Sequence, residues 1–284
     1  MNNSIAALAK IDNCRALWIL IREWLVTFCL FAAVIHFKNI FVWAFCFILL
    51  ARQSYAFFVL FHDAAHSHLF SSRKWNDIAG NWLCGGPITF ALDNFRSYHL
   101  KHHAEPLVPT DPDIKMISGY PIKKFSFFRK VVRDLLGVTN FKGHLLIDYQ
   151  MAKASSFDRY VPMIVSSSLI WLLFYLAGHG SYFFLFWMLP GATVSVLFVR
   201  IGLLAQHAGL KPNDNQGLVA RTVVSPMAYF FAPLNHNYHV DHHLYPAVPF
   251  YNLHRLHDLL LLDNEVPATN IFASYNCVLK DLVI

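Results

Sequence analysis

The chain has 284 residues, of which 56% are hydrophobic and only 14% are charged, and its formal net charge is +6. A soluble globular domain carries about 25% charged residues, so the composition excludes an ordinary soluble domain and favours an integral membrane protein. The five cysteines form no Cys-x-x-Cys pair, which argues against a disulfide framework and a cysteine-based zinc site. The basic residues gather in one loop between apolar stretches, so no nucleic-acid partner is expected.

Four stretches are apolar enough to cross a membrane, which takes about 20 residues. The predicted spans are approximately residues 18–37, 40–61, 161–177 and 182–204. Short connections join them into two antiparallel hairpins. Arg22, Glu23 and Arg52 fall inside the spans and are expected to snorkel, to pair or to face a protein interior, because charge that faces lipid is costly.

Lys and Arg residues set the expected orientation. Thirteen of them lie between residues 62 and 160, whereas the connection 178–181 has none. The positive-inside rule therefore places the loop 62–160, the C-terminal part 205–284 and both termini in the cytosol.

Three further segments are expected at the cytoplasmic membrane surface. Residues 77–90 and 217–234 are apolar but short and interrupted, which predicts interfacial helices rather than spans. Residues 123–137, "KKFSFFRKVVRDLLG", predict a basic amphipathic helix, with a plain solvated helix as the open alternative. The predicted fold is a single all-α integral membrane domain over residues 1–284: two transmembrane hairpins, interfacial helices and a cytosolic histidine-rich cap.

Histidines form three clusters at helical spacing, "HDAAH", "HLKHH" and "HVDHH". In a helix, residues three and four apart lie on one face. The candidate metal ligands are His62, His66, His99, His102, His103, His239, His242 and His243. One histidine on an apolar helix is usually a core residue, but eight in three clusters on one predicted side of the membrane indicate metal binding.

His207, in "LLAQHAG" just past the fourth span, is a ninth candidate ligand. The other histidines fall into two groups. Four adjoin the clusters but break the helical register, and they are expected in supporting or surface positions: His68, His236, His254 and His257. Three are expected to be incidental: His36, His144 and His179.

The number of imidazoles bears on the metal. One first-row ion takes about four to six ligands, so eight or nine imidazoles require two ions. Imidazole suits zinc, copper, iron and nickel alike, so the ligand type does not choose the metal. The absence of His-Glu-x-x-His argues against a zinc hydrolase. A metal transporter would place polar ligands within its spans, whereas these boxes lie beyond the span ends. The residues favour redox iron without deciding it.

The three clusters resemble the His-x-x-x-His, His-x-x-His-His and His-x-x-His-His boxes of the membrane-bound fatty-acid desaturase family. The flanks "NDIAGNWL", "DPD" and "NYHVDHHLYPAVPFYNL" resemble that family too, over roughly residues 50–262. The resemblance implies a four-span, non-haem di-iron enzyme that uses dioxygen and two external electrons, with the nine candidate histidines as iron ligands. One helical turn before His207, where acyl-CoA desaturases have Asn, this chain has Leu203. Another group or water then fills that place, or His207 is misaligned.

Four carboxylates are candidates to accept the second N–H of a ligating imidazole: Asp63, Asp111, Asp113 and Asp241. Each could equally be a surface charge or a helix cap. Tyr98 and Tyr238 precede the first histidine of a box and are expected to pack against their neighbours. No catalytic residue beyond the iron ligands is predicted.

By resemblance, the substrate is an acyl chain linked to lipid, CoA or carrier protein, into which a C=C bond is introduced. Five basic residues are expected to attract either the polar head of this substrate or the membrane surface: Lys123, Lys124, Arg129, Lys130 and Arg133. No haem domain is fused, so the expected electron donor is a separate ferredoxin or b-type cytochrome with its reductase. A bacterial inner membrane is favoured over the endoplasmic reticulum. Two alternatives stay open: a hydroxylase or ketolase of a lipid or carotenoid with the same irons, and a non-catalytic metal-binding membrane protein.

Overall fold

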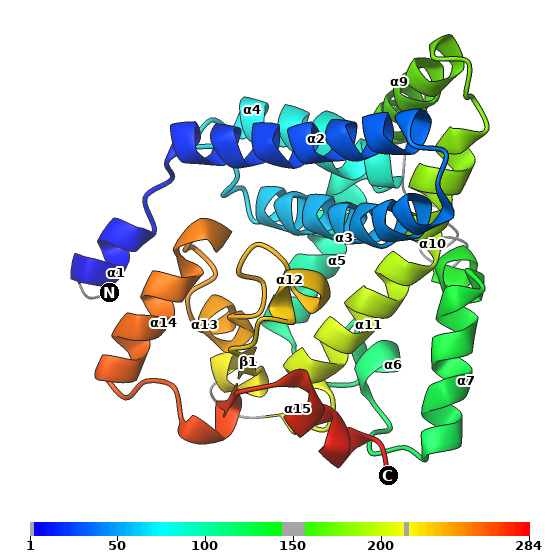
Figure 1. Ribbon diagram of the computed structural model, residues 1–284. Helices are drawn as coiled ribbons and strands as arrows, with labels where there is room; N and C mark the ends of the chain where they lie inside the picture. Colours follow the sequence, from blue (N-terminus) through cyan, green and yellow to red (C-terminus); the bar gives the residue numbers. More distant parts are fainter. Residues whose placement is uncertain (1–2, 144–156, 213–215) are drawn as a thin grey trace. The chain divides into compact units, whose positions relative to one another are not determined.

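The computed structural model describes residues 3–143, 157–212 and 216–284. Helices dominate these residues, and four of them are long and apolar enough to cross a membrane (Figure 1). The prediction of an all-α fold with four span-length helices is confirmed. The chain divides into two compact units. Unit 1 comprises Met1–Ile11, Arg96–Lys130 and Phe198–Ile284, and unit 2 comprises Asp12–Phe95 and Val131–Leu197.

The span-length helices each extend a few residues beyond the predicted span at one of their ends. They are Asn13–His36 (α2), Ile40–Ala65 (α3), Phe157–Leu176, which contains α9 (Val161–Leu176), and Phe184–His207. The last is composed of a π-helical turn Phe184–Met188, α10 (Leu189–Ala192) and α11 (Val194–His207). Asp12 caps α2 by accepting a hydrogen bond from the Arg15 N–H, which extends the helix beyond its apolar window.

In unit 2, α2 and α3 form a tight hairpin, and α3 is buried along its second half. Residues 73–88 follow α3 as α4 (Arg73–Ile78), a π-helical segment Ala79–Gly85 and a short 3-10 turn Gly86–Ile88, so the predicted helical path over 77–90 is found. The π-helical segment approaches α3 so closely that a Cβ on Gly80 would lie 2.7 Å from the Ala64 Cβ. Glycine is required there because no larger residue fits.

The three charged residues of the first hairpin pair with one another. The Arg52 Nη1 lies 2.6 Å from the Glu23 Oε2, and Arg22 also contacts the Glu23 carboxylate. The Gln53 side chain donates to the Glu23 backbone oxygen and carboxylate. Glu23 and Arg52 are buried. Of snorkelling, pairing and facing a protein interior, the structure therefore shows pairing for these charges.

Unit 1 contains short helices and one small parallel strand pair. The helices within it are α1 (Asn3–Leu8), α6 (Ile114–Ile117), α12 (Ala228–Phe231), α13 (His239–Leu244), α14 (Leu253–Leu262) and α15 (Tyr275–Leu282). The strands are β1 (Thr222–Val223) and β2 (Ile271–Phe272), and 3-10 turns cover Gln216–Val219, Phe250–Asn252 and Ala268–Asn270. Three of the described helices cross the unit boundary: α5 (Leu92–Ala104), α11 and α7 (Lys124–Leu135). The last of these confirms the predicted helix within 123–137.

The predicted interfacial helix over 217–234 is wrong. That segment contains the end of a 3-10 turn, strand β1 and the four-residue α12. β-branched Thr222 and Val223 favour the extended backbone that pairs with β2, and Pro226 and Pro233 flank α12. Apolar composition alone did not distinguish this arrangement from a helix.

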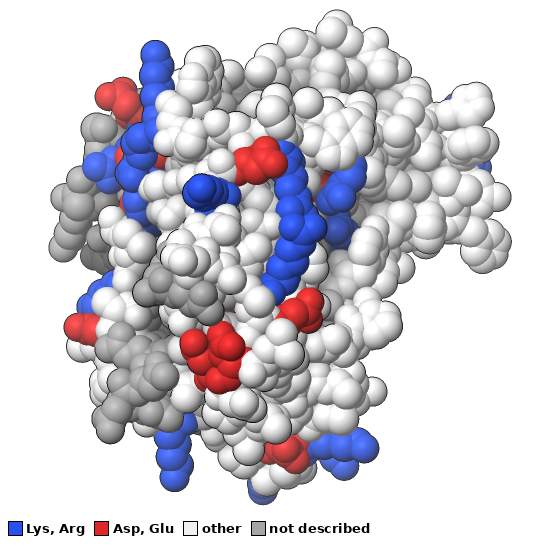
Figure 2. Space-filling view, turned by 90° about the vertical axis from the view of Figure 1, so that its left-hand side faces the viewer, with Lys and Arg blue, Asp and Glu red and all other residues white. Residues whose placement is uncertain are grey.

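Large apolar side chains remain exposed on the span-length helices, among them Phe41 at 81% and Leu176 at 74%. Figure 2 shows charged side chains scattered among uncharged residues on one face, whereas the exposed side chains of the span-length helices are largely apolar. Such a surface suits a bilayer, which solvates apolar side chains that water would not. His144, expected to be incidental, lies outside the described residues.

Candidate metal centre

Seven of the nine candidate ligands lie in unit 1, on three helices. α5 carries His99, His102 and His103, the end of α11 carries His207, and α13 carries His239, His242 and His243. Each box has a helical spacing of three and four residues, so its rings project from one side of a helix. These seven imidazoles form two groups.

The first group, called here the four-imidazole group, comprises His102, His207, His239 and His243. One ring nitrogen of each lies within 4.8 Å of the others. The Nε2 of His239 is 2.8 Å from the Nε2 of His207 and 3.2 Å from that of His243. His102, His207 and His239 are buried. Helices distant in sequence thus bring four nitrogen donors to one point inside the unit.

The second group comprises His99, His103 and His242, again from α5 and α13. The Nε2 of His103 lies 3.0 Å from the Nε2 of His99 and 3.1 Å from that of His242. Two neighbouring sets of imidazoles therefore share the same pair of helices.

Hydrogen-bond partners on the outer ring edges orient the four-imidazole group. The Nδ1 of His102 is 2.9 Å from the Asp111 Oδ1, and the Nδ1 of His207 is 3.1 Å from the Val219 carbonyl oxygen. Because carboxylates and carbonyls accept, Nδ1 carries the proton in both rings. The neutral rings then present the Nε2 lone pairs to the group, as metal binding requires.

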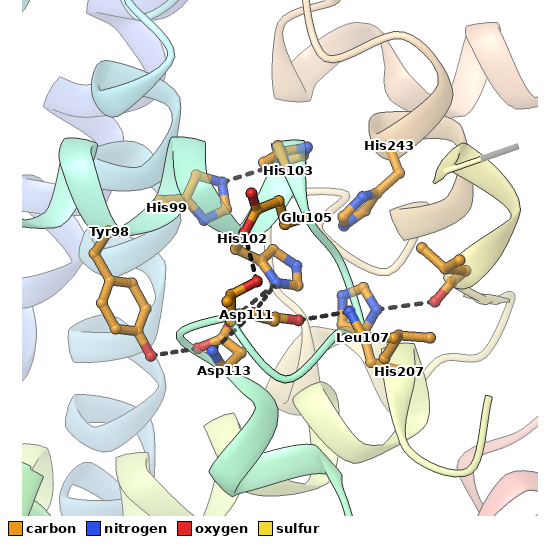
Figure 3. A network of polar contacts seen from close by, with 12 residues as sticks. Tyr98, His99, His102, His103, Glu105, Leu107, Asp111, Asp113, His207 and His243 are labelled. Atoms are coloured by element: carbon orange, nitrogen blue, oxygen red, sulfur yellow. Dashed lines mark hydrogen bonds and ion pairs between the residues drawn. The ribbon is translucent and has the colours of Figure 1, made fainter. Parts of the chain in front are cut away.

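Asp111 is itself held in place by the loop after α5. Its carboxylate accepts hydrogen bonds from the Leu107 N–H at 2.7 Å and the Asp113 N–H at 2.8 Å. Figure 3 shows the contacts continuing outward, where the Tyr98 hydroxyl donates to the Asp113 Oδ1 at 2.7 Å. Tyr98, expected only to pack against its neighbours, is part of this polar network.

Protonation equilibria differ across the centre. Burial lowers the pKa of His239 well below its usual value, and the surrounding imidazoles add to that effect. Burial opposes the charged form of His102 as well, but the hydrogen bond to Asp111 and the charge of Asp113 outweigh it and raise its pKa. His239 is therefore neutral over the physiological pH range and offers a lone pair to a cation.

The donor set and its spacing fit a first-row transition metal ion. Metal–imidazole bonds of about 2.0–2.1 Å place neighbouring ligand nitrogens roughly 3 Å apart. The separations of 2.8–3.2 Å between Nε2 atoms agree with that spacing. Imidazole nitrogens suit iron, copper, zinc and nickel, so the geometry supports a metal without naming it.

Asp241, predicted as a partner of a ligating imidazole, contacts two other side chains. Its Oδ1 lies 2.8 Å from the Nδ1 of His257 on α14, and its Oδ2 accepts a hydrogen bond from the Thr222 hydroxyl of β1 at 2.6 Å. Asp241 is fully buried. It therefore fixes the six-residue α13, with its three box histidines, between α14 and β1. Of the supporting and surface positions expected for His257, the structure shows the supporting one, although its spacing did not indicate Asp241 as the partner.

The remaining two candidates, His62 and His66, lie at the end of α3 in unit 2. Their ring centroids are 5.0 Å apart, and both His62 and Asp63 are buried. Asn76 of α4 secures the turn that follows: its amide donates to the Ala64 carbonyl at 2.9 Å, and its Oδ1 accepts from the Leu69 N–H. The end of the first box is thus held by the buried Asn76 amide, which the sequence pattern did not single out.

A sequence model of the family described as fatty acid desaturase matches residues 38–269. The chain belongs to the fatty acid desaturase family. Together with the four apolar helices, this membership indicates a membrane protein. The matched region contains every box histidine and both candidate groups.

Individual desaturases are similar at low identity. Fatty acid desaturase 3 of Bos taurus is 23% identical over 236 residues, covering 70% of this chain and 50% of that protein. The chloroplastic omega-6 fatty acid desaturase of Arabidopsis thaliana is 26% identical, covering 71% and 49%. Dihydrorhizobitoxine desaturase of Bradyrhizobium elkanii is 25% identical, covering 71% and 63%. The chain thus spans about half the length of the first two relatives.

Leu203, where acyl-CoA desaturases were expected to have Asn, packs against a cluster that contains Leu107, Ile117 and Val219. Its side chain brings no polar atom to the centre. His207, one turn further along α11, nevertheless lies in the four-imidazole group. The departure at Leu203 therefore leaves the position of His207 in that group unchanged.

Proposed function

We propose that this protein is a dioxygen-dependent di-iron desaturase that introduces a C=C bond into an acyl chain. The observation that carries the proposal is the four-imidazole group, in which three helices present buried nitrogen donors to one point in unit 1. Membership of the desaturase family supports the reaction type. The relatives' names, which describe desaturases of fatty acids and of dihydrorhizobitoxine, support it further.

Each group of imidazoles would hold one iron. His102, His207, His239 and His243 are the proposed ligands of the first ion, and His99, His103 and His242 are proposed ligands of the second. His62 and His66 are proposed to complete the second set. Their assignment rests on the box pattern of the sequence and on their shared place at the end of α3. When bound, the irons supply the oxidising power that removes hydrogen from an unactivated methylene, which no side chain can supply.

The protein's own residues orient and tune these ligands. Asp111 and the Val219 carbonyl hold the Nδ1 protons of His102 and His207, so that Nε2 is available in both rings. Asp111 also places negative charge at the edge of an otherwise neutral ligand set, and it makes His102 a better donor. Asp241 and His257 keep α13 in position. Asp63 is a proposed further support for the α3 ligands, because it is buried and lies between His62 and His66 in the sequence.

The substrate, orientation and electron source are parts of the same proposal. An apolar acyl chain suits a protein whose span-length helices are rich in aromatic side chains. The basic loop supports a cytosolic placement of the boxes and both termini. Two electrons would come from a separate ferredoxin or b-type cytochrome system in a bacterial inner membrane. A hydroxylase or ketolase would use the same ligands, and product analysis separates the outcomes.

Lipid profiling of cells that express the full-length chain tests the proposal. The expected result is a new acyl product that has lost two hydrogens, present with the wild type and absent with His239→Ala. The matched control is His179→Ala, which changes a half-exposed histidine in the loop after α9 and is expected to retain the product. A product that gains one oxygen atom would instead establish a hydroxylase. A desaturated product that persists in His239→Ala would overturn the assignment.

A further inference from the structure

Helix α7 has one face packed against unit 1. Phe127 packs with Tyr120 and Val283 against the cluster that contains Leu282. The C-terminal residues pair with the segment that leads into the helix: the Ile122 N–H donates to the Leu282 oxygen and the Lys124 N–H to the Ile284 oxygen, both at 2.9 Å. These contacts fix which side of α7 is turned outward.

The outward side of α7 is apolar where a solvated helix would be polar. Phe125 is 75% exposed and Phe128 is 62% exposed, and they are separated by three residues, so they lie on one face. Val132 and Leu136 continue that face at helical spacing, and Leu136 is 71% exposed. A helix that met only water would not place large apolar side chains in a continuous stripe.

Cationic side chains border the apolar stripe. Lys124 lies on one edge of it, and Arg129 and Arg133 lie on the other, all three exposed. The acidic residue of the helix, Asp134, is buried on the opposite side. An apolar stripe flanked by Lys and Arg is the pattern of a helix that lies in a membrane interface and is attracted to anionic lipid.

We propose that the outward face of α7 is a docking surface for anionic phospholipid. Phe125 and Phe128 enter the boundary between head groups and acyl chains, while Lys124, Arg129 and Arg133 pair with lipid phosphates. This binding does not involve the metal centre. It makes the stability of α7, and of the C-terminal segment that pairs with residues 122–124, depend on the charge of the surrounding leaflet.

Hydrogen exchange measured by mass spectrometry on the full-length protein in nanodiscs tests the proposal. One set of discs contains phosphatidylcholine alone, and the other contains added phosphatidylglycerol. The amides of residues 125–136 are expected to exchange roughly tenfold more slowly in the anionic discs, since each cation near a charged leaflet adds to the attraction. Raising the salt concentration is expected to reduce the difference, because it screens exposed charges.

Two variants of equal charge change make the test specific. In the triple variant Lys124→Gln, Arg129→Gln, Arg133→Gln the difference between the two kinds of disc is expected to vanish. The matched control removes three exposed cations elsewhere, by Lys211→Gln, Arg255→Gln and Lys280→Gln, and is expected to keep the difference. Equal exchange of α7 in both discs for the wild type, or an unchanged difference in the α7 triple variant, would overturn the proposal. Unchanged exchange of α3 shows that the variants remain folded.

Discussion

Two regions of this protein bury polar side chains, and they do so in different ways. In the α2–α3 hairpin, the Arg52 guanidinium meets the Glu23 carboxylate, and Gln53 fills further hydrogen-bonding positions. In the four-imidazole group, ring nitrogens face other ring nitrogens at 2.8–3.2 Å. The first region neutralises its own charges. The second gathers lone pairs around a common point and is completed only by a cation. A self-paired network is structural, whereas a convergent set of like donors indicates a ligand.

The largest expected effect breaks the second region. His239→Ala removes a buried donor that contacts two members of the group, so we expect the first ion to be lost and activity to fall more than about 100-fold. Iron content per chain and product yield measure this. His179→Ala serves as the control, and iron content equal to wild type in His239→Ala would contradict the ligand assignment.

Breaking the Glu23–Arg52 network of the α2–α3 hairpin is expected to lower the folding stability and to leave metal binding unchanged. Arg52→Ala removes the buried guanidinium from the Glu23 carboxylate and leaves it only the half-exposed Arg22, so we expect a cost of up to about 3–5 kcal/mol. The double variant Glu23→Leu, Arg52→Met replaces the pair by apolar groups and is expected to recover most of that loss. Thermal unfolding in detergent measures both. Equal destabilisation by the single and the double variant would contradict this, because it would show that the ion pair itself stabilises the fold more than apolar side chains do.

A third variant acts on the orientation of a ligand rather than on the ligand itself. Asp111→Asn keeps the shape of the side chain but removes its charge, so His102 loses a charged acceptor at Nδ1. Loss of such a partner lowers metal affinity about 10- to 100-fold. Competition with a chelator measures iron affinity, with Asp258→Asn on α14 as the control for a charge removed from the surface. An affinity unchanged in Asp111→Asn would show that the loop does not tune the centre.

The smallest expected effect concerns His257, which reaches the ligands only through Asp241. His257→Ala removes the 2.8 Å contact that holds α13 against α14, and we expect iron affinity to fall by at most about tenfold. Chelator-driven iron release should be faster, together with faster hydrogen exchange of residues 239–244. His254→Ala, on the same helix, is the comparison. If both variants release iron at the wild-type rate, Asp241 needs no support from α14.

Periodicity within short stretches of the sequence was enough to predict the span-length helices and the side of a helix on which each box of histidines lies. The four apolar runs predicted the span-length helices, and the spacing within each box placed its histidines on one side of α5 and α13. Contacts between distant segments were not predictable in this way. The partner of Asp241 is sixteen residues away on another helix, and Glu23 meets Arg52 across a hairpin. The strand pairing of residues 222–223 with 271–272 likewise depends on long-range contact, which explains why a helix was expected there.

Metal stoichiometry of the purified full-length protein, reconstituted anaerobically with ferrous iron, tests the central claim most directly. Two irons per chain are expected, with one retained when His207 and His239 are both changed to Ala, because those residues belong to only one of the two groups. A wild-type protein that binds one ion or none under these conditions would contradict a di-iron centre.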